Sequence, residues 1–195
     1  MAVIEDTKDN QGNWLQQYKN NSTKDGVTWQ SMMKRCLTDG RWQDTCPSYI
    51  GCSVSESFSD FQTFTEWYVT QVGYGLPKYE LDKDILVKGN KIYCPENCVL
   101  VPQELNKFLI APKNKSTSLP QGVTWHNSNK KFQATIRENG KKRHLGYFTT
   151  EADAYTAYKV AKEQAAKKWY NRLLSGEFMV DSRVIERLKF WQLNE

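Results

Sequence analysis

The sequence predicts an α+β protein in which a ββα unit is followed by a three-stranded antiparallel sheet with a helix, and then by a last helix. Two turn signals support this prediction. Asn139-Gly140 separates two runs of alternating polarity, the strongest short-range signal for a β-hairpin. Gly89-Asn90 lies between two other strand-like runs, after which Pro102 opens a helical segment. Apolar residues at helical spacing occur on both sides of these strands.

Composition changes along the chain indicate five segments. They are a polar arm (residues 1–25), the ββα unit with its preceding helices (26–110), a linker (111–120), the sheet with its helix (121–170) and a C-terminal amphipathic helix (171–195). The arm is expected to have little structure, apart from a short helical turn around Trp14 and Leu15.

Two helices are expected before the ββα strands. The first is predicted by an apolar stripe with helical spacing, which comprises Trp29, Met32, Met33, Cys36 and Leu37. Residues 41–57 show little periodicity and are expected to form a loop. The second helix carries Phe61, Phe64, Trp67 and Tyr68 and ends before Gly73. We interpret both stripes as core.

The ββα unit is expected to have a first strand over residues 81–86 and a second strand within residues 92–101. Its helix follows Pro102. Asp82 would stand on the first strand and Asn106 on the helix. A carboxylate and an amide placed in this way can hold a divalent metal against a phosphodiester.

In the second half, the strand over residues 131–137 alternates between an apolar face and a basic or amide-bearing face. Thr150 is expected to cap the next helix. Four residues at helical spacing would pack that helix closely on the sheet: Ala154, Tyr158, Ala161 and Ala165. The polar face of the sheet would then remain free.

Positive charge is concentrated in this half. The net charge is +5, with 11 Lys and Arg against 14 Asp and Glu in residues 1–110, and 16 against 8 in residues 111–195. The pattern favours a polyanion-binding part joined to a part with another task, the alternative being cations that only solvate a surface.

No apolar run approaches the ~20 residues of a membrane span. The five cysteines, an odd number without a secretory signal, are interpreted as reduced thiols of a cytoplasmic protein.

The signatures Gly122-Val123-Thr124-Trp125, residues 131–137 and residues 144–148, followed by a helix, resemble the APETALA/ethylene-response-factor DNA-binding domain over residues 119–166. This resemblance implies that the sheet enters the major groove of double-stranded DNA. The contact residues that it implies are Gln121, Thr124, His126, Gln133, Thr135, Arg137, Lys142, Arg143 and His144. Plant members carry more arginines on the first strand, so their base preference does not transfer to this chain.

Residues 27–108 resemble the HNH, or ββα-metal, endonucleases, in a variant common in phage proteins. The matching motifs are Leu81-Asp82-Lys83, Gly89-Asn90 and Tyr93-Cys94-Pro95-Glu96-Asn97-Cys98. The resemblance implies that Asp82 and Asn106 hold Mg²⁺ or Mn²⁺ and that Asn97 is the middle structural asparagine. It places Lys83 at the general-base position, with Asp84 beside the scissile phosphate.

The lysine is a departure from the HNH pattern, in which the base is histidine. A lysine can act as a base only if burial lowers its pKa. The alternative is that Lys83 stabilises charge in the transition state, with water activated by the metal or by Asp84. A structural zinc site is disfavoured, because the cysteines do not form paired Cys-x-x-Cys knuckles.

The function expected from these resemblances is site-selective, metal-dependent cleavage of double-stranded DNA, as in homing endonucleases. The first alternative is a DNA-binding regulator or accessory protein with an inactive nuclease fold. The second is a protein-interaction role, with the last helix forming a dimer or partner surface.

Overall fold

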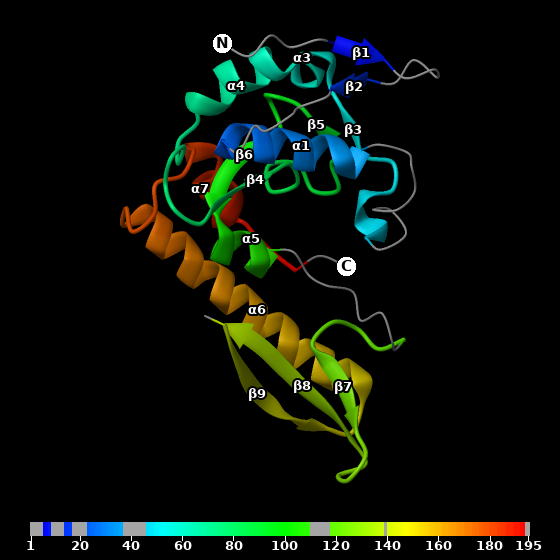
Figure 1. Cartoon of the computed structure of the whole chain (residues 1–195). Coiled ribbons are helices and arrows are strands. Elements are labelled where there is room, and N and C mark those ends of the chain that lie inside the picture. Colours follow the sequence, from blue (N-terminus) through cyan, green and yellow to red (C-terminus); the bar gives the residue numbers. More distant parts are fainter. Residues whose placement is uncertain are drawn as a thin grey trace.

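The computed structural model describes residues 6–8, 14–16, 23–36, 46–109, 118–138 and 140–193. These residues form six α-helices and four small sheets, which confirms the α+β class. Figure 1 shows the three-stranded sheet at one end of the molecule and the smaller sheets and first helices at the other, with α6 reaching from one to the other. Within the described ranges, no helix combines the length and apolarity needed to cross a bilayer.

The N-terminal arm contains two strands. β1 (Asp6–Lys8) and β2 (Trp14–Gln16) pair antiparallel, with Lys8 opposite Trp14. The helical turn expected around Trp14 and Leu15 is therefore wrong.

Two helices form where the apolar stripes predict them, α1 (Lys24–Cys36) and α4 (Phe61–Val69). Their buried aromatic and Met residues are Trp29, Met32, Phe61, Phe64 and Tyr68. The indole Nε1 of Trp29 donates to the backbone oxygen of Phe58 at 2.8 Å. Leu37, the last predicted member of the first stripe, lies outside the described residues.

The segment between these helices has more structure than its sequence suggests. It contains the 3₁₀ turn η1 (Pro47–Tyr49), the strand β3 (Ser53–Val54) and the helix α3 (Glu56–Ser59). The loop predicted over residues 41–57 is therefore wrong for its described part. Ser55 caps α3 by accepting a hydrogen bond from the backbone of Phe58, a local signal that apolar periodicity does not reveal.

The ββα unit consists of β4 (Tyr79–Asp82), β6 (Val99–Pro102) and α5 (Gln103–Leu109). β4 and β6 are antiparallel, whereas the short β5 (Ile92–Tyr93) pairs in parallel with β3. The first strand is shorter than predicted because it ends at Asp82. The Asp82 Oδ1 atom accepts hydrogen bonds from the backbone of Asp84 and Ile85, which turns the chain.

In the second half, β7 (Val123–His126), β8 (Lys131–Glu138) and β9 (Lys141–Phe148) form an antiparallel sheet in that order. The β8–β9 hairpin is confirmed, and Gly140 has a φ of 74° in its turn. Asn139 lies outside the described residues, as do residues 111–117 of the predicted linker.

Helix α6 (Glu151–Leu174) covers one face of this sheet, and Thr150 caps it as predicted. The four predicted helix positions are all buried: Ala154, Tyr158, Ala161 and Ala165. Small residues allow close packing, as Gly122 shows. Its φ is 78°, and a Cβ atom on it would lie 2.1 Å from Cδ2 of Tyr158.

One apolar core joins the two halves of the chain. It combines residues of the ββα unit with residues of β8, α6 and α7: Ile85, Val99, Val101, Leu105 and Phe108 with Ile136, Tyr158, Trp169, Leu173, Val184 and Leu188, among others. The buried Lys162 ammonium of α6 donates a hydrogen bond to the backbone oxygen of Phe108 at the end of α5. α6 therefore belongs to both parts.

Helix α7 (Ser182–Lys189) folds back on the same chain. Asp181 caps it, and Val184 and Leu188 are buried in the core shared with α6. Its apolar side is thus used within the chain, whereas Phe190 just beyond it is 75% exposed.

Candidate nucleic-acid interface

The face of the sheet opposite α6 collects most of the residues predicted to contact DNA. Strand register and alternation place nine side chains on this surface, the outer sheet face: Thr124, His126, Lys131, Gln133, Thr135, Arg137, Lys142, His144 and Tyr147. Their neighbours Val123, Ala134 and Ile136 point the other way and are buried. Seven of the nine predicted residues lie on this face, and Gln121 is half-buried just before β7.

Arg143 is the exception. It pairs in register with Ile136, on the side of the sheet that faces α6. Its Nε donates to Glu138 at 2.8 Å, and Glu138 also accepts from Lys168 of α6 at 3.3 Å. Burial opposes ionisation of Glu138, but these two cations hold its pKa below the ordinary value. The expectation that Arg143 shares a surface with Lys142 is therefore wrong.

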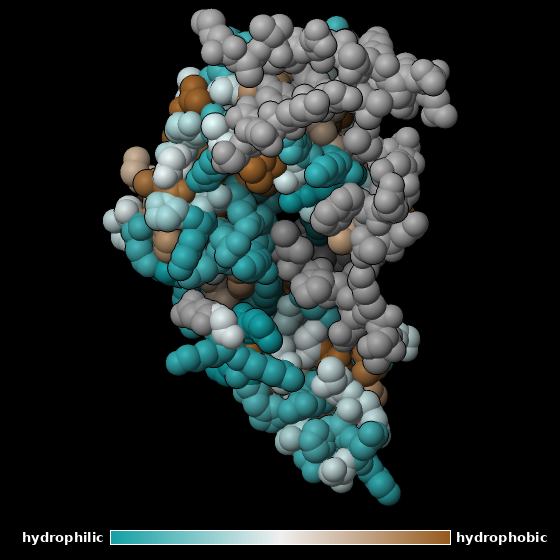
Figure 2. Space-filling view, in the orientation of Figure 1, coloured by the Kyte–Doolittle hydropathy of each residue, from teal (hydrophilic) through white to brown (hydrophobic). Residues whose placement is uncertain are grey.

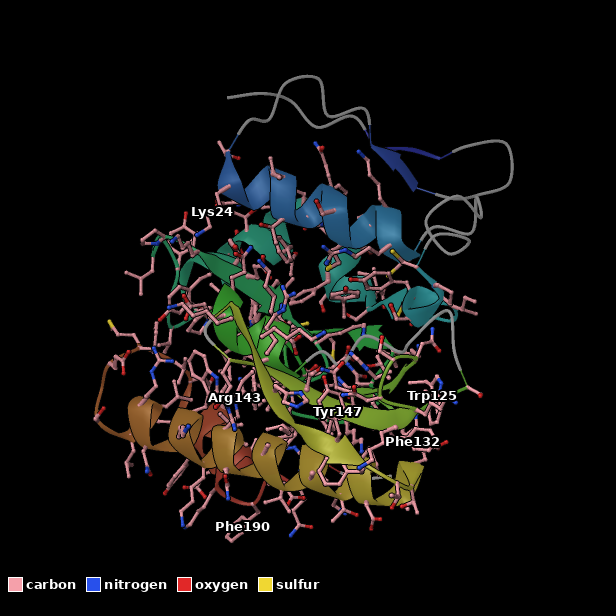
Figure 3. The ribbon with its side chains drawn as sticks, turned by 90° about the horizontal axis from the view of Figure 1, so that it is seen from below. Lys24, Trp125, Phe132, Arg143, Tyr147 and Phe190 are labelled. Carbon is pink, nitrogen blue, oxygen red and sulfur yellow. The ribbon has the colours of Figure 1, made fainter. Side chains whose placement is uncertain are left out.

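Tyr147 belongs to the outer sheet face but was not predicted there. Its ring lies 5.0 Å from that of His126 and 4.6 Å from that of His144, measured between centroids. Gln133 Nε2 lies 3.1 Å from Nδ1 of His144. In Figure 3, Tyr147 lies between Arg143 and the Trp125–Phe132 pair. The result is a cluster of aromatic and amide groups that suits base edges and sugars.

A β-bulge explains the position of Tyr147. Register shifts between Ala134 and Thr135, which lie opposite Gly146 and His144, so Leu145 is the additional residue on β9. Gly146 has a φ of 146°, which favours glycine. A glycine inside a strand pattern is the signal that could have indicated the bulge.

The positive charges on the outer sheet face are uncompensated. Arg137 and Lys142 lie opposite each other on β8 and β9, both exposed. Within the described part of the chain, neither side chain forms an ion pair or hydrogen bond. Figure 2 shows that the surface formed by the sheet and α6 is largely hydrophilic on the visible side. Such exposed, unpaired cations are suited to phosphate groups.

The predicted catalytic residues of the ββα unit are mostly buried. Asp82 is 8% exposed, Lys83 4% and Asn106 8%. Asp82 Oδ1 accepts from the backbone N–H groups of Asp84 at 2.7 Å and Ile85 at 2.6 Å. Burial raises the pKa of Asp82, and these two hydrogen bonds oppose the rise. Its role in the fold is to turn the chain after β4.

Lys83 also has structural partners. Its ammonium donates to Asp84 Oδ1 at 2.6 Å and to the backbone oxygen of Asn90 at 3.0 Å, and it lies 5.6 Å from the centre of the Tyr93 ring. Asn90 donates back to the oxygen of Lys83, and Asn97 donates to Asn90 Oδ1 at 3.3 Å. Lys83 and Asn97 thus fix the loop that contains the Gly-Asn turn.

Asn106 contacts a residue that the sequence did not single out. Its Nδ2 donates to Glu80 Oε2 at 3.1 Å, and Gln103 of the same helix donates to the other oxygen of Glu80. Glu80 precedes Asp82 by two residues on β4, so both side chains leave the same side of the strand. Acidic residues alternate with apolar ones in this strand, and that pattern could have indicated that Glu80 shares a face with Asp82. Asn106 Oδ1 is buried and has no hydrogen-bond partner among the described residues.

The two residues predicted to hold a divalent metal, Asp82 and Asn106, lie on β4 and α5 of the ββα unit. One oxygen of Asp82 is used by the backbone, and both predicted ligands are buried. Among the residues that the structure describes, no three His, Cys, Asp or Glu side chains gather around a common point. Asn106 Oδ1 and the second carboxylate oxygen of Asp82 accept no hydrogen bond from the described residues, so each predicted ligand keeps one oxygen available to a cation.

Family models, curated proteins and solved structures were compared with the chain, and none matched.

Proposed function

We propose that this protein binds double-stranded DNA through its outer sheet face. The observation that carries the proposal is that Arg137 and Lys142 lie side by side on a sheet face that α6 leaves free, and that neither side chain has an ion-pair partner among the described residues. Thr124, Gln133 and Thr135 add hydrogen-bonding groups beside these charges. A β-ribbon fits the width of the major groove, where an arginine can reach a guanine edge and a lysine a phosphate.

The binding test requires the full chain. A fragment containing only the sheet and the last helices would expose Trp169, whose ring packs on Phe108 of the ββα unit. We would measure fluorescence anisotropy of a random-sequence duplex over a range of salt concentrations, and then select preferred sequences from the same pool.

Arg137→Ala and Arg143→Ala form a matched pair, because one arginine lies on each side of the sheet. Arg137→Ala should reduce the differences in affinity between DNA sequences, since a bidentate arginine–guanine contact supplies about 1–3 kcal/mol of discrimination. Arg143→Ala should leave affinity and preference close to wild type. Lys142→Ala should weaken all sequences alike and lower the log–log salt slope by about 0.9. Equal effects of the two arginine variants, or tighter binding to duplex RNA, would overturn the proposal.

Metal-dependent cleavage of the bound duplex is the second candidate function. The observation in its favour is the buried Oδ1 atom of Asn106, an acceptor without a partner on the helix that faces Glu80. The burial of Asp82 and Lys83 stands against it. The first alternative, a regulator or accessory protein that binds without cutting, requires only the outer sheet face.

Incubation of the full chain with phage and host genomic DNA, with and without Mg²⁺ or Mn²⁺, separates these two candidates. Discrete fragments that appear only with metal, and that Asp82→Asn removes, would establish cleavage. Asn retains the acceptor oxygen that the backbone needs at this position. Bound but intact DNA with either metal would favour the regulator.

A further inference from the structure

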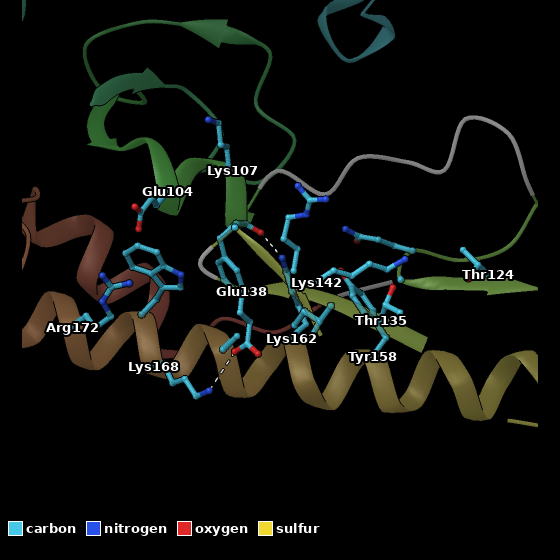
Figure 4. A pocket seen from close by; sticks show the side chains of 18 residues that line it. Glu104, Lys107, Thr124, Thr135, Glu138, Lys142, Tyr158, Lys162, Lys168 and Arg172 are labelled. Carbon is cyan, nitrogen blue, oxygen red and sulfur yellow. Dashed lines mark hydrogen bonds and ion pairs between the residues drawn. The ribbon is translucent and has the colours of Figure 1, made fainter. Parts of the chain in front are cut away.

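A groove of about 970 Å³ lies between α5, α6 and one end of β8 (Figure 4). Among the described residues, six cationic side chains line it: Lys107, Arg137, Lys142, Lys162, Lys168 and Arg172. The acidic lining residues are Glu104 and Glu138. The groove is therefore strongly positive, although α5 belongs to the acidic half of the chain.

The groove exists because β7 is shorter than β8. The pairing of β7 with β8 begins at Val123 opposite Ala134, and Thr135 donates to the backbone oxygen of Gly122. Residues 136–138 extend beyond this point and, among the described strands, have a neighbour only in β9. The open side of β8 faces α5, which Phe108 fixes to α6 through its contacts with Lys162 and Trp169.

Half of the six cations are already used within the protein. Lys168 pairs with Glu138, Arg172 pairs with Glu177, and Lys162 donates to the oxygen of Phe108. The dashed lines in Figure 4 mark the contacts of Lys168 and Lys162.

The other three cations are Lys107, Arg137 and Lys142, and all are exposed. In the described ranges their side chains make no ion pair or hydrogen bond. Arg137 and Lys142 also belong to the outer sheet face, so the groove continues that face toward the ββα unit. Lys107 is the unpaired cation that the ββα unit contributes.

We propose that this groove holds the sugar–phosphate backbone of the DNA duplex that the outer sheet face binds, with Lys107 contacting a phosphate. The inference rests on the proposed function and extends its interface to a second part of the chain. Phosphate contacts position a protein on the duplex without reading sequence. Lys107 therefore contributes affinity and orientation, whereas Arg137 contributes sequence preference.

The test compares Lys107→Ala with Lys88→Ala in the full chain. Lys88 is exposed, lies in the same half and is not among the groove residues. Lys107→Ala should weaken binding to every duplex and lower the log–log salt slope by about 0.9, without changing the selected sequence. Lys88→Ala should leave the slope unchanged. Glu104→Gln should tighten binding, because it removes a negative charge from the groove.

Circular dichroism and the thermal midpoint establish that each variant is folded. If Lys107→Ala leaves the salt slope at the wild-type value while Arg137→Ala still flattens sequence preference, the groove inference is overturned and the proposed function stands. If neither variant changes binding, the groove inference and the proposed function are both overturned. A change in the selected sequence with Lys107→Ala would also overturn the inference, because it would make Lys107 a base contact.

Discussion

Replacement of Gly122 by alanine tests the close packing of the sheet on α6. The residue has a φ of 78°, and an added Cβ atom would lie 2.1 Å from Cδ2 and 2.4 Å from Cγ of Tyr158. The Tyr158 side chain is 3% exposed and therefore has little space into which to move. The backbone oxygen of Gly122 also accepts the hydrogen bond from Thr135 that begins the β7–β8 pairing.

Gly140 provides the matched control. Its φ is 74°, but no heavy atom lies within 4 Å of an added Cβ atom. A left-handed conformation costs alanine about 1–2 kcal/mol at either position. The lower entropy of the unfolded alanine chain offsets about 0.4–1 kcal/mol of this. Overpacking at Gly122 adds about 1–3 kcal/mol, so Gly122→Ala should destabilise the protein by about 2–4 kcal/mol and Gly140→Ala by about 1 kcal/mol.

Urea unfolding, monitored by circular dichroism and by tryptophan fluorescence, measures both losses. A double-mutant cycle with Tyr158→Ala then isolates the clash, which should disappear when the ring is absent. Equal losses for the two glycine variants would refute the reasoning, as would a Gly122→Ala loss that is unchanged in the Tyr158→Ala background.

Two further predictions concern buried charges. Burial lowers the pKa of Lys162 from 10.5 to about 8, so between these values the unfolded chain binds a proton that the folded chain does not. The free energy of unfolding should therefore rise from pH 8 to pH 10.5 by up to about 3 kcal/mol from this group. Lys162→Met should remove that part of the rise in urea titrations, and an identical pH profile for the two proteins would contradict it. Asp82→Ala leaves two backbone N–H groups without an acceptor and should cost about 2–5 kcal/mol, whereas Asp82→Asn should cost less than about 1 kcal/mol. Equal destabilisation by the two Asp82 variants would show that Oδ1 is not the important atom.

Features with local sequence signals were predicted well. The alternation of residues 131–137, the glycine at position 140 and the Thr150 cap each act within a few residues, and the structure contains the hairpin and helix that they indicate. Alternation counted from the hairpin turn also assigns Lys142 and Arg143 to opposite faces. The sequence interpretation treated the basic run as one surface, which is why Arg143 was misplaced.

The end of β4 at Asp82 has a local cause that the sequence interpretation missed. The Asp82 side chain accepts hydrogen bonds from the backbone two and three residues on, but the residue was interpreted as a metal ligand. Features that depend on distant contacts were not predictable from local signals. The sharing of α6 between the two halves depends on packing of Phe108 and Trp169, residues far apart in the chain. The partners of Lys83 and Asn106 come from the loop at Asn90 and from β4, so their structural roles appear only in three dimensions.

The continuous core around α6 has a consequence for how binding energy is distributed. A ligand that binds only the folded state stabilises every element that unfolds together with its site, by about 2.7 kcal/mol at a hundredfold excess over the dissociation constant. Because α6 is buried against the sheet at one end and against α5 and α7 at the other, both halves are expected to unfold in one cooperative transition. DNA bound to the sheet would then protect the amides of β4 and β6 from hydrogen exchange as strongly as those of β8, although it touches neither strand.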